Sequence, residues 1–474
     1  MLILKCNHKN ENMFKPEVYA ARRKRLREML SGGVVLLPGN AEASMNYPAN
    51  TYHYRQDSDF LYYFGHDHDG LSGIIDVDEG KEILVGDDVS MDDIIWMGPQ
   101  PLMKDQALQC GTEHTLPGAK LPAYIQDALK KGRKVHILPP YRGDRWLSLE
   151  GIFGMSHGEI RKYVSEELIR AVVKMRSVKD ALEIAEIEKA IDTAYIMHTT
   201  SMKMAMPGVV EQEIAGTIEG IALAHGGPVS FPVILSVDGQ TLHNHHHHNV
   251  LKEGRMMVTD AGCETSMHYA SDITRTVPVG GKFNTRQKEI YEIVLKANMV
   301  TIEAIRPGIF YRDVHLLAAR TIAEGLKALG IMKGDTEEAV RQGAHALFFP
   351  HGLGHMMGLD VHDMEGLGEN YVGYDGTVKR SEQFGLAFLR FARKLEPGFV
   401  LTDEPGCYFI PALIDLWKSE GRFTEFINYD KTELYKDFGG VRIEDDILVT
   451  ETGHKVLGKP IPKTVEEVEE TMTG

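Results

Sequence analysis

The chain has 474 residues, of which 43% are hydrophobic and 25% are charged. This length exceeds one ordinary core and predicts two domains, and the composition is that of an ordinary soluble globular protein. A formal net charge of −16 repels phosphate backbones and disfavours nucleic acid as a partner, and no segment has the roughly 18 consecutive apolar residues of a membrane-spanning helix.

Two features of the sequence indicate a reducing, cytoplasmic location. The first residues, "MLILKCNHKNENMF", lack the apolar region and small-residue cleavage site of a secretory signal, and Met13 is an alternative start. The four cysteines lie far apart and have no CxxC spacing: Cys6, Cys110, Cys263 and Cys407. We therefore expect neither a disulfide framework nor a zinc knuckle.

The region from residue 13 to residue 175 mixes short helical and strand-like pieces and is expected to form a first domain. The basic run at 22–28 is expected to be the solvated face of a helix. "GGVVLLPG" and "GLSGIIDVDEGKEILVGDD" predict buried strands that end in turns. The aromatic segment 55–65 is expected to be a core or edge strand.

The pattern changes at residue 176, where a second domain, 176–474, is expected to begin. Apolar residues recur at helical spacing until Pro207-Gly208, and a second helix is expected from Glu211 to His225. Further elements alternate in the order hairpin, helix, helix, strand, strand, with these ranges: 255–264 with 270–279, 285–305, 311–330, 399–410 and 441–450. The order indicates a duplicated α+β unit whose sheet carries the chemistry.

Four carboxylates stand inside apolar, strand-like runs: Asp260, Asp272, Glu404 and Glu444. Each one alone could be a solvent-facing strand residue or a turn residue. If the four converge, they cannot all stay ionised in a cleft without compensation. Two divalent cations would neutralise them, so the pattern predicts a dinuclear metal site.

The glycine-rich segment "HGLGHMMGLDVHD" contributes His351, His355 and His362. The first two are four residues apart, which would suit a zinc pair on a helix. Gly352 takes the place where an HExxH motif has glutamate, and the glycines argue against a helix. No βαβ context supports a nucleotide loop either. For any one of these histidines alone, a hydrogen-bonded structural role is the alternative.

The motifs "HGLGHMMGLDVHD", "VTDAGCE…SDITRT", "DEPGCY" and "VRIEDDILVT" together closely resemble the metallopeptidase family of aminopeptidase P and prolidase. The likeness runs from about residue 176 to about residue 455, and "RRKRLREML" and "YHYRQDSDFLYYFG" look like the amino-terminal domain of the same family. The resemblance implies an α+β pita-bread catalytic domain, preceded by a smaller α/β domain.

The resemblance also implies five metal ligands. Asp260 would bind one ion, and Asp272 and Glu444 would bridge both. His355 and Glu404 would bind the other ion, and Glu404 would also relay protons. One histidine among four carboxylates favours Mn²⁺, with Co²⁺, Zn²⁺ or Fe²⁺ as substitutes, and the ions would activate water at neutral pH.

Three histidines match positions that contact the substrate in the family rather than the metal: His243, His351 and His362. His243 belongs to the run "TLHNHHHHNV", which is dense in potential ligands. Only His243 of this run matches a family position. If the run is extended, His245 and His247 lie on the same side as His243, and His246 and His248 point away.

Two departures from the family pattern concern spacing. The interval from Asp260 to Asp272 is one residue longer than the family's, and an extra residue inside a strand would turn a side chain to the wrong face. We therefore expect it in the turn around "CETSMHY". The second departure is a long amphipathic insertion, residues 410–440, which is either a packed surface element or a lid or subunit contact.

The expected function is dinuclear-metal-dependent hydrolysis of the Xaa-Pro bond at the N-terminus of proline-containing peptides, by a homodimer or homotetramer. A prolidase that acts on Xaa-Pro dipeptides is the alternative, since it would use every residue named above. A non-catalytic scaffold on the same fold is a more remote alternative, because such relatives lose ligands and all five are present here.

Overall fold

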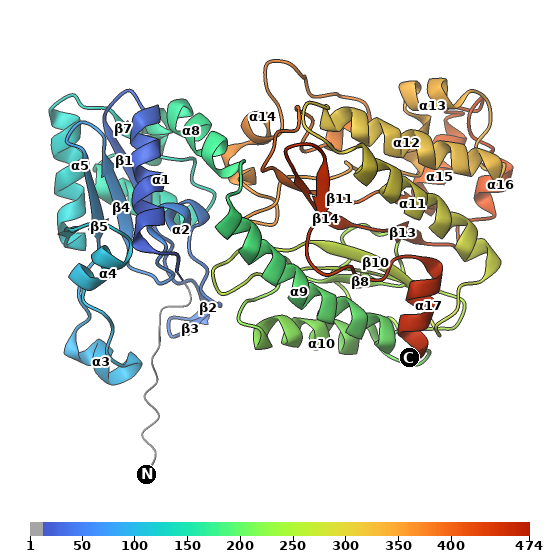
Figure 1. Cartoon of the computed structure of the whole chain (residues 1–474), viewed down its shortest axis with the longest axis horizontal. Helices are drawn as coiled ribbons and strands as arrows, with labels where there is room; N and C mark the ends of the chain where they lie inside the picture. The colour runs from blue at the N-terminus through green and yellow to red at the C-terminus, as the bar shows by residue number, and fades with distance from the viewer. Residues whose placement is uncertain (1–12) are drawn as a thin grey trace, which may run out of the picture. The chain divides into compact units, whose positions relative to one another are not determined.

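The computed structural model describes residues 13–474 and is drawn in Figure 1. The chain divides into two compact units between Met175 and Arg176. The expectations about a signal sequence and about Cys6 lie outside the described residues. Within residues 13–474, no helix is long and apolar enough to cross a membrane.

The N-terminal unit is built on a mixed five-stranded sheet of order β6-β5-β4-β1-β7. Its strands are β1 (Val34–Pro38), β4 (Ser72–Asp76), β5 (Lys81–Val85), β6 (His114–Leu116) and β7 (Val135–His136), and a separate pair comprises β2 (Ser44–Tyr47) and β3 (Asn50–Thr51). Its helices are α1 (Pro16–Met29), α2 (Ser58–Phe64), α3 (Met91–Met97), α4 (Met103–Gln109), α5 (Leu121–Lys130), α6 (Gly143–Phe153), α7 (His157–Ile160) and α8 (Glu166–Arg176). The buried strands predicted around "GGVVLLPG" and "GLSGIIDVDEGKEILVGDD" are confirmed as β1, β4 and β5.

The prediction of a strand at 55–65 is wrong, because the segment contains helix α2. The Asp57 carboxylate accepts the backbone N–H groups of Asp59 and Phe60 and so caps the first turn. Phe60 and Phe64, four residues apart, stack with ring centroids 5.4 Å apart. A strong cap and i,i+4 aromatic packing therefore prevail over the strand propensity of the aromatic residues.

The basic run at 22–28 is not wholly solvated as predicted. Arg23 is fully buried, and its guanidinium donates to the backbone carbonyl oxygens of Tyr63 and Cys110 at 2.6 and 2.8 Å. Arg22 is also buried, and its guanidinium lies 4.0 Å from the ring centroid of Tyr62. Arginine can be buried in this way because carbonyl oxygens satisfy its fixed fork of donors.

The predicted helices of the C-terminal unit are confirmed. They are α9 (Ala181–Met204), α10 (Glu211–Ala224), α11 (Thr285–Ala304) and α12 (Tyr311–Ala328). Helix α9 packs against α10, and α11 packs against α12 (Figure 1). The shorter helices are α13 (Thr336–Gln342), α14 (Glu369–Val372), α15 (Pro411–Ser419), α16 (Tyr429–Glu433) and α17 (Val465–Thr473).

Three small sheets carry the carboxylate-bearing segments. The first has the order β10-β9-β8, the second β11-β14-β15, and the third pairs β12 with β13. The strands are β8 (Ile234–Ser236), β9 (Met256–Ala261), β10 (Ile273–Pro278), β11 (Val400–Asp403), β12 (Gly406–Tyr408), β13 (Gly440–Arg442), β14 (Asp445–Val449) and β15 (His454–Val456).

The register of β9 against β10 answers the question raised by the longer Asp260–Asp272 interval. Pairing is continuous from Ile273 opposite Ala261 to Pro278 opposite Met256, with Thr274 opposite Asp260. The extra residue therefore lies in the connection, as expected. Because Asp272 is two residues before Thr274, its side chain is expected on the same face as that of Asp260.

The predicted strands at 399–410 and 441–450 each divide into two. The first breaks at Glu404 between β11 and β12, and the second breaks at Glu444 between β13 and β14. The backbone N–H of Glu444 donates to the carbonyl oxygen of Thr274 at 3.1 Å. Buried Arg275 donates to the carbonyl oxygen of Glu444 at 2.6 Å. These bonds fasten the second break to strand β10.

Candidate metal centre and catalytic cavity

One cavity of about 700 Å³ in the C-terminal unit collects every site residue that the sequence predicted. Its walls include Asp260, Asp272, Glu404, Glu444, His243, His351, His355 and His362. These residues come from segments separated by up to two hundred positions in the chain. The convergence that the dinuclear hypothesis required is therefore present.

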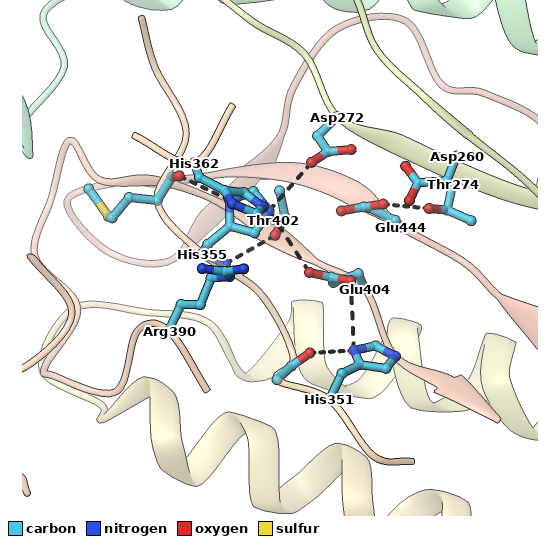
Figure 2. A network of polar contacts seen from close by, with 12 residues as sticks. Asp260, Asp272, Thr274, His351, His355, His362, Arg390, Thr402, Glu404 and Glu444 are labelled. Carbon is cyan, nitrogen blue, oxygen red and sulfur yellow. Dashed lines mark hydrogen bonds and ion pairs between the residues drawn. The ribbon is translucent and has the colours of Figure 1, made fainter. Parts of the chain in front are cut away.

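At the centre of the cavity, Asp272, His355 and Glu444 each bring a possible ligand atom within 4.8 Å of the other two. The Nδ1 atom of His355 lies 3.0 Å from the carbonyl oxygen of Met356 and must donate to it. Its Nε2 atom therefore carries the free lone pair. Figure 2 shows this nitrogen facing Asp272 and Glu404, whose nearest oxygens are 3.4 and 3.9 Å away.

Strand β11 determines where His355 lies. The backbone N–H of His355 donates to Thr402 Oγ1 at 3.2 Å, and the N–H of Thr402 donates back to the His355 carbonyl at 3.0 Å. A Cβ on Gly354 would lie 2.2 Å from the Thr402 carbonyl oxygen. The glycine before His355 is therefore needed for this close approach, which explains why the glycine-rich segment is not a helix.

Burial and like charge raise the pKa values of three of these carboxylates in the metal-free protein. Burial and then the neighbouring Glu444 raise the pKa of Asp272 well above its usual value. Burial and then Glu404 do the same to the pKa of Glu444. Burial raises the pKa of Glu404 to about 8. Without a compensating cation, these groups tend to retain protons rather than remain ionised together.

The donor set fits divalent cations. Asp260 Oδ1 and Asp272 Oδ1 are buried, and neither oxygen has a hydrogen-bond partner among the described residues. Burial also lowers the pKa of His355 well below its usual value, so its ring stays neutral and can act as a ligand. Clustered carboxylate oxygens with one imidazole nitrogen are a common ligand set for first-row divalent ions.

Asp260 differs from the other three carboxylates because an arginine holds it. Its Oδ2 atom lies 2.6 Å from Nη2 of buried Arg442. Arg442 also donates to the Tyr408 hydroxyl at 3.0 Å and to Thr274 Oγ1 at 3.1 Å. Thr274 in turn donates to Glu444 at 2.6 Å (Figure 2). This network orients two of the carboxylates.

Sequence reasoning missed Arg442, Tyr408 and Thr274. Each stands in an apolar, strand-like run beside a carboxylate that was identified. The carboxylates were predicted because each is a polar side chain inside an apolar, strand-like run. The same pattern holds for these three residues.

The histidines of the glycine-rich segment take different positions. His351 Nδ1 lies 2.7 Å from the Gly352 carbonyl oxygen and must donate, so its Nε2 accepts from the Tyr408 hydroxyl at 2.8 Å. Burial and then Arg442 lower the pKa of His351 to about 3, which keeps this ring neutral. The ring of His362 lies 4.1 Å from that of His355, and its Nδ1 is 2.6 Å from Glu365.

The histidine run follows the predicted alternation only in part. His243 and His245 line the cavity, as expected for the same side of an extended segment. His247 does not line it: this ring is buried, with Nδ1 3.0 Å from the Leu235 carbonyl oxygen. His246 and His248 are exposed, and their rings stack with centroids 6.1 Å apart.

The insertion contributes to the cavity wall. Its first helix, α15, places Leu413 in the lining and buries Trp417, whereas Leu416 is 50% exposed. Three further lining residues that sequence reasoning missed are Phe384, Phe388 and Arg390. Figure 2 shows Arg390 on the side of His355 that is away from Asp260.

Two family models match the chain. The model of metallopeptidase family M24 matches residues 185–451, and that of the aminopeptidase P N-terminal domain matches residues 19–138. Both matches agree with the fold predicted from the sequence, a smaller α/β domain before a pita-bread catalytic domain.

Individual relatives cover almost the whole chain. Xaa-Pro dipeptidase of Homo sapiens is 31% identical over 98% of this chain and 95% of its own length. A probable Xaa-Pro aminopeptidase of Aspergillus clavatus is 34% identical over 88% of each chain.

Among solved structures, zinc-substituted Escherichia coli aminopeptidase P in complex with product superposes with a TM-score of 0.80 at 29% identity. The superposition covers 97% of this chain and 99% of that one. The predicted fold is thereby confirmed over both units. The chain belongs to metallopeptidase family M24 and is a hydrolase.

Proposed function

We propose that this enzyme hydrolyses the Xaa-Pro bond at the N-terminus of peptides, with two divalent ions held by Asp260, Asp272, His355, Glu404 and Glu444. The observation that carries the proposal is the buried cluster of Asp272, His355 and Glu444, whose possible ligand atoms lie within 4.8 Å of one another. The relatives named Xaa-Pro aminopeptidase and Xaa-Pro dipeptidase support the substrate class.

The ions are proposed to be Mn²⁺, because oxygen donors outnumber the single imidazole nitrogen, and Co²⁺, Zn²⁺ or Fe²⁺ could substitute. Bound ions would lower the pKa of water to about 7 and so supply a nucleophile at neutral pH. Asp272 and Glu444 are proposed as the bridging ligands. Asp260 would hold one ion from its unpartnered Oδ1 atom while Arg442 holds its Oδ2 atom.

Glu404 is proposed to move the proton of the reaction. Its carboxylate lines the cavity, with an oxygen 3.9 Å from Nε2 of His355 and another 3.8 Å from Nδ1 of His351. It would take a proton from the attacking water and deliver it to the departing proline nitrogen. His243 and His362 would donate hydrogen bonds to the oxygen of the attacked carbonyl.

His351 is proposed to contact the substrate from a neutral, fixed ring. Because Nδ1 donates to a backbone carbonyl and Nε2 accepts from Tyr408, the tautomer and the orientation are both set. The ring therefore contributes a shaped, uncharged wall rather than a proton donor.

Substrate length divides the proposal into two candidates. An aminopeptidase acting on longer peptides is the leading one, because a cavity of about 700 Å³ extends beyond the carboxylates to Phe388 and Leu413. A dipeptidase is favoured by Arg390, which lines the cavity and, besides the ion pairs of its Nη1 atom with Glu365 and Glu369, could pair with the carboxylate of an Xaa-Pro dipeptide. Comparing kcat/KM for Xaa-Pro and Xaa-Pro-Yaa substrates decides between them: the leading candidate requires the tripeptide to be hydrolysed at least as efficiently.

A reducing compartment and a homo-oligomeric state belong to the same proposal. Cys110, Cys263 and Cys407 are buried and unpaired, which supports a cytoplasmic location. A homodimer or homotetramer stays a prediction, for which sedimentation analysis is the measurement.

The proposed proton transfer predicts the behaviour of Glu404→Gln. The amide keeps the shape of the side chain but cannot accept the proton of water, so kcat should fall by about 10²–10⁴-fold. Circular dichroism should show an unchanged fold. Exposed Glu425 offers the matched control, since Glu425→Gln should keep normal turnover. Near-normal activity of Glu404→Gln would refute the role.

The proposed role of His243 as a hydrogen-bond donor to the oxyanion can be tested with neighbouring histidines as controls. His243→Ala should lower kcat by about 10²–10³-fold, the effect of removing one donor to an oxyanion. His246→Ala and His248→Ala should stay within about twofold of the parent enzyme, because both rings are exposed and outside the cavity lining. Equal effects of the three substitutions on steady-state kinetics would contradict the assignment.

The raised pKa of Asp272 predicts a pH-dependent stability in metal-free protein. The pKa is near 3.9 when the chain is unfolded and well above that when it is folded. The folded state thus binds more protons over this interval, and the free energy of unfolding falls as pH rises through it, by up to ~1.4 kcal/mol per pH unit.

The substitution Asp272→Asn replaces the ionisable carboxyl group with a neutral amide. In chelator at about pH 8, we expect the variant to unfold at higher urea concentration than the parent protein, whereas with metal present the order should reverse because a ligand is lost. The exposed control Asp430→Asn should change neither midpoint. A destabilised Asp272→Asn protein in chelator would show that the carboxylate is not under electrostatic strain.

A further inference from the structure

We infer that the cavity contains a subsite for the apolar side chain of the residue that follows proline, formed by Phe384, Phe388, Ile410 and Leu413. The inference rests on the proposed function, because it names a substrate feature of the same site. It assigns a specificity-determining role to the insertion, for which the sequence suggested only a packed element, a lid or a subunit contact.

The four residues all belong to the apolar part of the cavity lining, and Phe384 contacts Phe388. Phe384 is 38% exposed and Phe388 is 55% exposed, so both leave apolar surface uncovered. Exposed apolar surface that lines a concave site is stabilised when a ligand covers it. The four side chains therefore match an apolar side chain and have no charged or polar group of their own to offer a ligand.

The insertion holds this section in place. Trp417 is 2% exposed, and its ring lies against that of Phe384 with centroids 5.8 Å apart. Phe384 in turn meets the edge of Phe388, with centroids 5.9 Å apart. Leu413 is one helical turn before Trp417 on α15, so both lie on neighbouring positions of one face. Trp417 is thus a positioning residue, and Leu413 forms the contact surface.

The segment that carries Phe388 is also fixed on its other side. A Cβ on Gly352 would lie 2.9 Å from the Phe388 carbonyl oxygen and 2.9 Å from Leu389 Cα. The Tyr374 hydroxyl donates to the Leu389 carbonyl oxygen at 2.6 Å. The subsite is therefore built between the histidine segment and α15, and it does not depend on a free loop.

The proposed reaction indicates which part of the peptide reaches this subsite. Phe388 and Arg390 are two residues apart, and both line the cavity. Arg390 lies on the side of His355 away from Asp260 (Figure 2), and its Nη1 atom already pairs with Glu365 and Glu369 at 2.9 and 3.0 Å. Because the bond before proline must lie at the carboxylate cluster, the residue after proline lies beyond it, where Phe388 and Leu413 line the cavity.

The size of the effect follows from the area that would be covered. Burying a leucine-sized side chain contributes enough to change kcat/KM by about tenfold to a hundredfold. The parent enzyme should therefore hydrolyse Ala-Pro-Leu more efficiently than Ala-Pro-Asp by a ratio in this range.

The test compares this ratio among variants of α15. Leu413→Ser should reduce it to near one, and Leu413→Arg should invert it in favour of Ala-Pro-Asp. Leu416→Ser is the matched control, because Leu416 belongs to the same helix but is 50% exposed and outside the cavity lining. A ratio of kcat/KM values for one preparation does not depend on the fraction of active enzyme, so partial misfolding cannot imitate the result.

A binding measurement gives a readout without turnover. By calorimetry, metal-free parent protein should bind the dipeptide Pro-Leu at least tenfold more tightly than Pro-Asp. Leu413→Arg should reverse that order. Equal affinities for the two dipeptides in the parent protein would overturn the inference.

The outcomes separate this inference from the proposed function. If tripeptides are hydrolysed with no preference for Leu over Asp, or if Leu413→Arg leaves the preference unchanged, the subsite is wrong and the function stands. If only Xaa-Pro dipeptides are hydrolysed, the dipeptidase candidate holds and the subsite is overturned. If the metal-loaded enzyme hydrolyses neither class, both proposals fail.

Discussion

The rest of this structure depends on one constraint, the repulsion among four carboxylates that line one cavity. Burying like charges together costs far more than any single hydrogen bond returns. The protein nevertheless fixes them firmly: Arg442 holds Asp260, Thr274 donates to Glu444, and Arg275 fastens the Glu444 backbone. The strands that carry Glu404 and Glu444 break at those residues. These contacts hold the carboxylates in fixed positions despite their repulsion, as a site that binds cations requires.

The same constraint explains why the histidines of the cavity differ in hydrogen bonding and in the roles proposed for them. Burial keeps the rings of His351 and His355 neutral, so neither adds a proton to the site. His355 offers its free Nε2 to the carboxylate cluster, whereas both nitrogens of His351 are occupied by Gly352 and Tyr408. His243 also lines the cavity, where it can meet the substrate. The roles proposed for these histidines in metal binding, substrate contact and the cavity wall thus follow from their hydrogen bonds rather than from residue type.

The fold could be predicted from the sequence, and the residues predicted for the site do line one cavity. Both predictions were possible because motif order and apolar periodicity are local signals. The long-range partners were not predictable in this way. Arg23 looks solvated until the carbonyl of Cys110, far along the chain, is seen to accept from it. Phe384 and Leu413 form one wall only because Trp417 packs between distant segments. Arg442 is, like the carboxylates, a charged residue in an apolar strand, but its role depends on contact with Asp260, which lies on a strand of a different sheet.

The most direct test of the central claim is a metal titration of the purified, metal-free protein, with bound Mn²⁺ measured by mass spectrometry and hydrolysis of an Xaa-Pro-Yaa peptide followed in parallel. If the carboxylates are held together for a dinuclear centre, activity should rise with metal uptake and reach its plateau at about two ions per chain. Glu444→Gln should lower the uptake as well as the activity. Full hydrolysis by protein that binds no metal, or uptake of two ions by Glu444→Gln with unchanged affinity, would contradict the account.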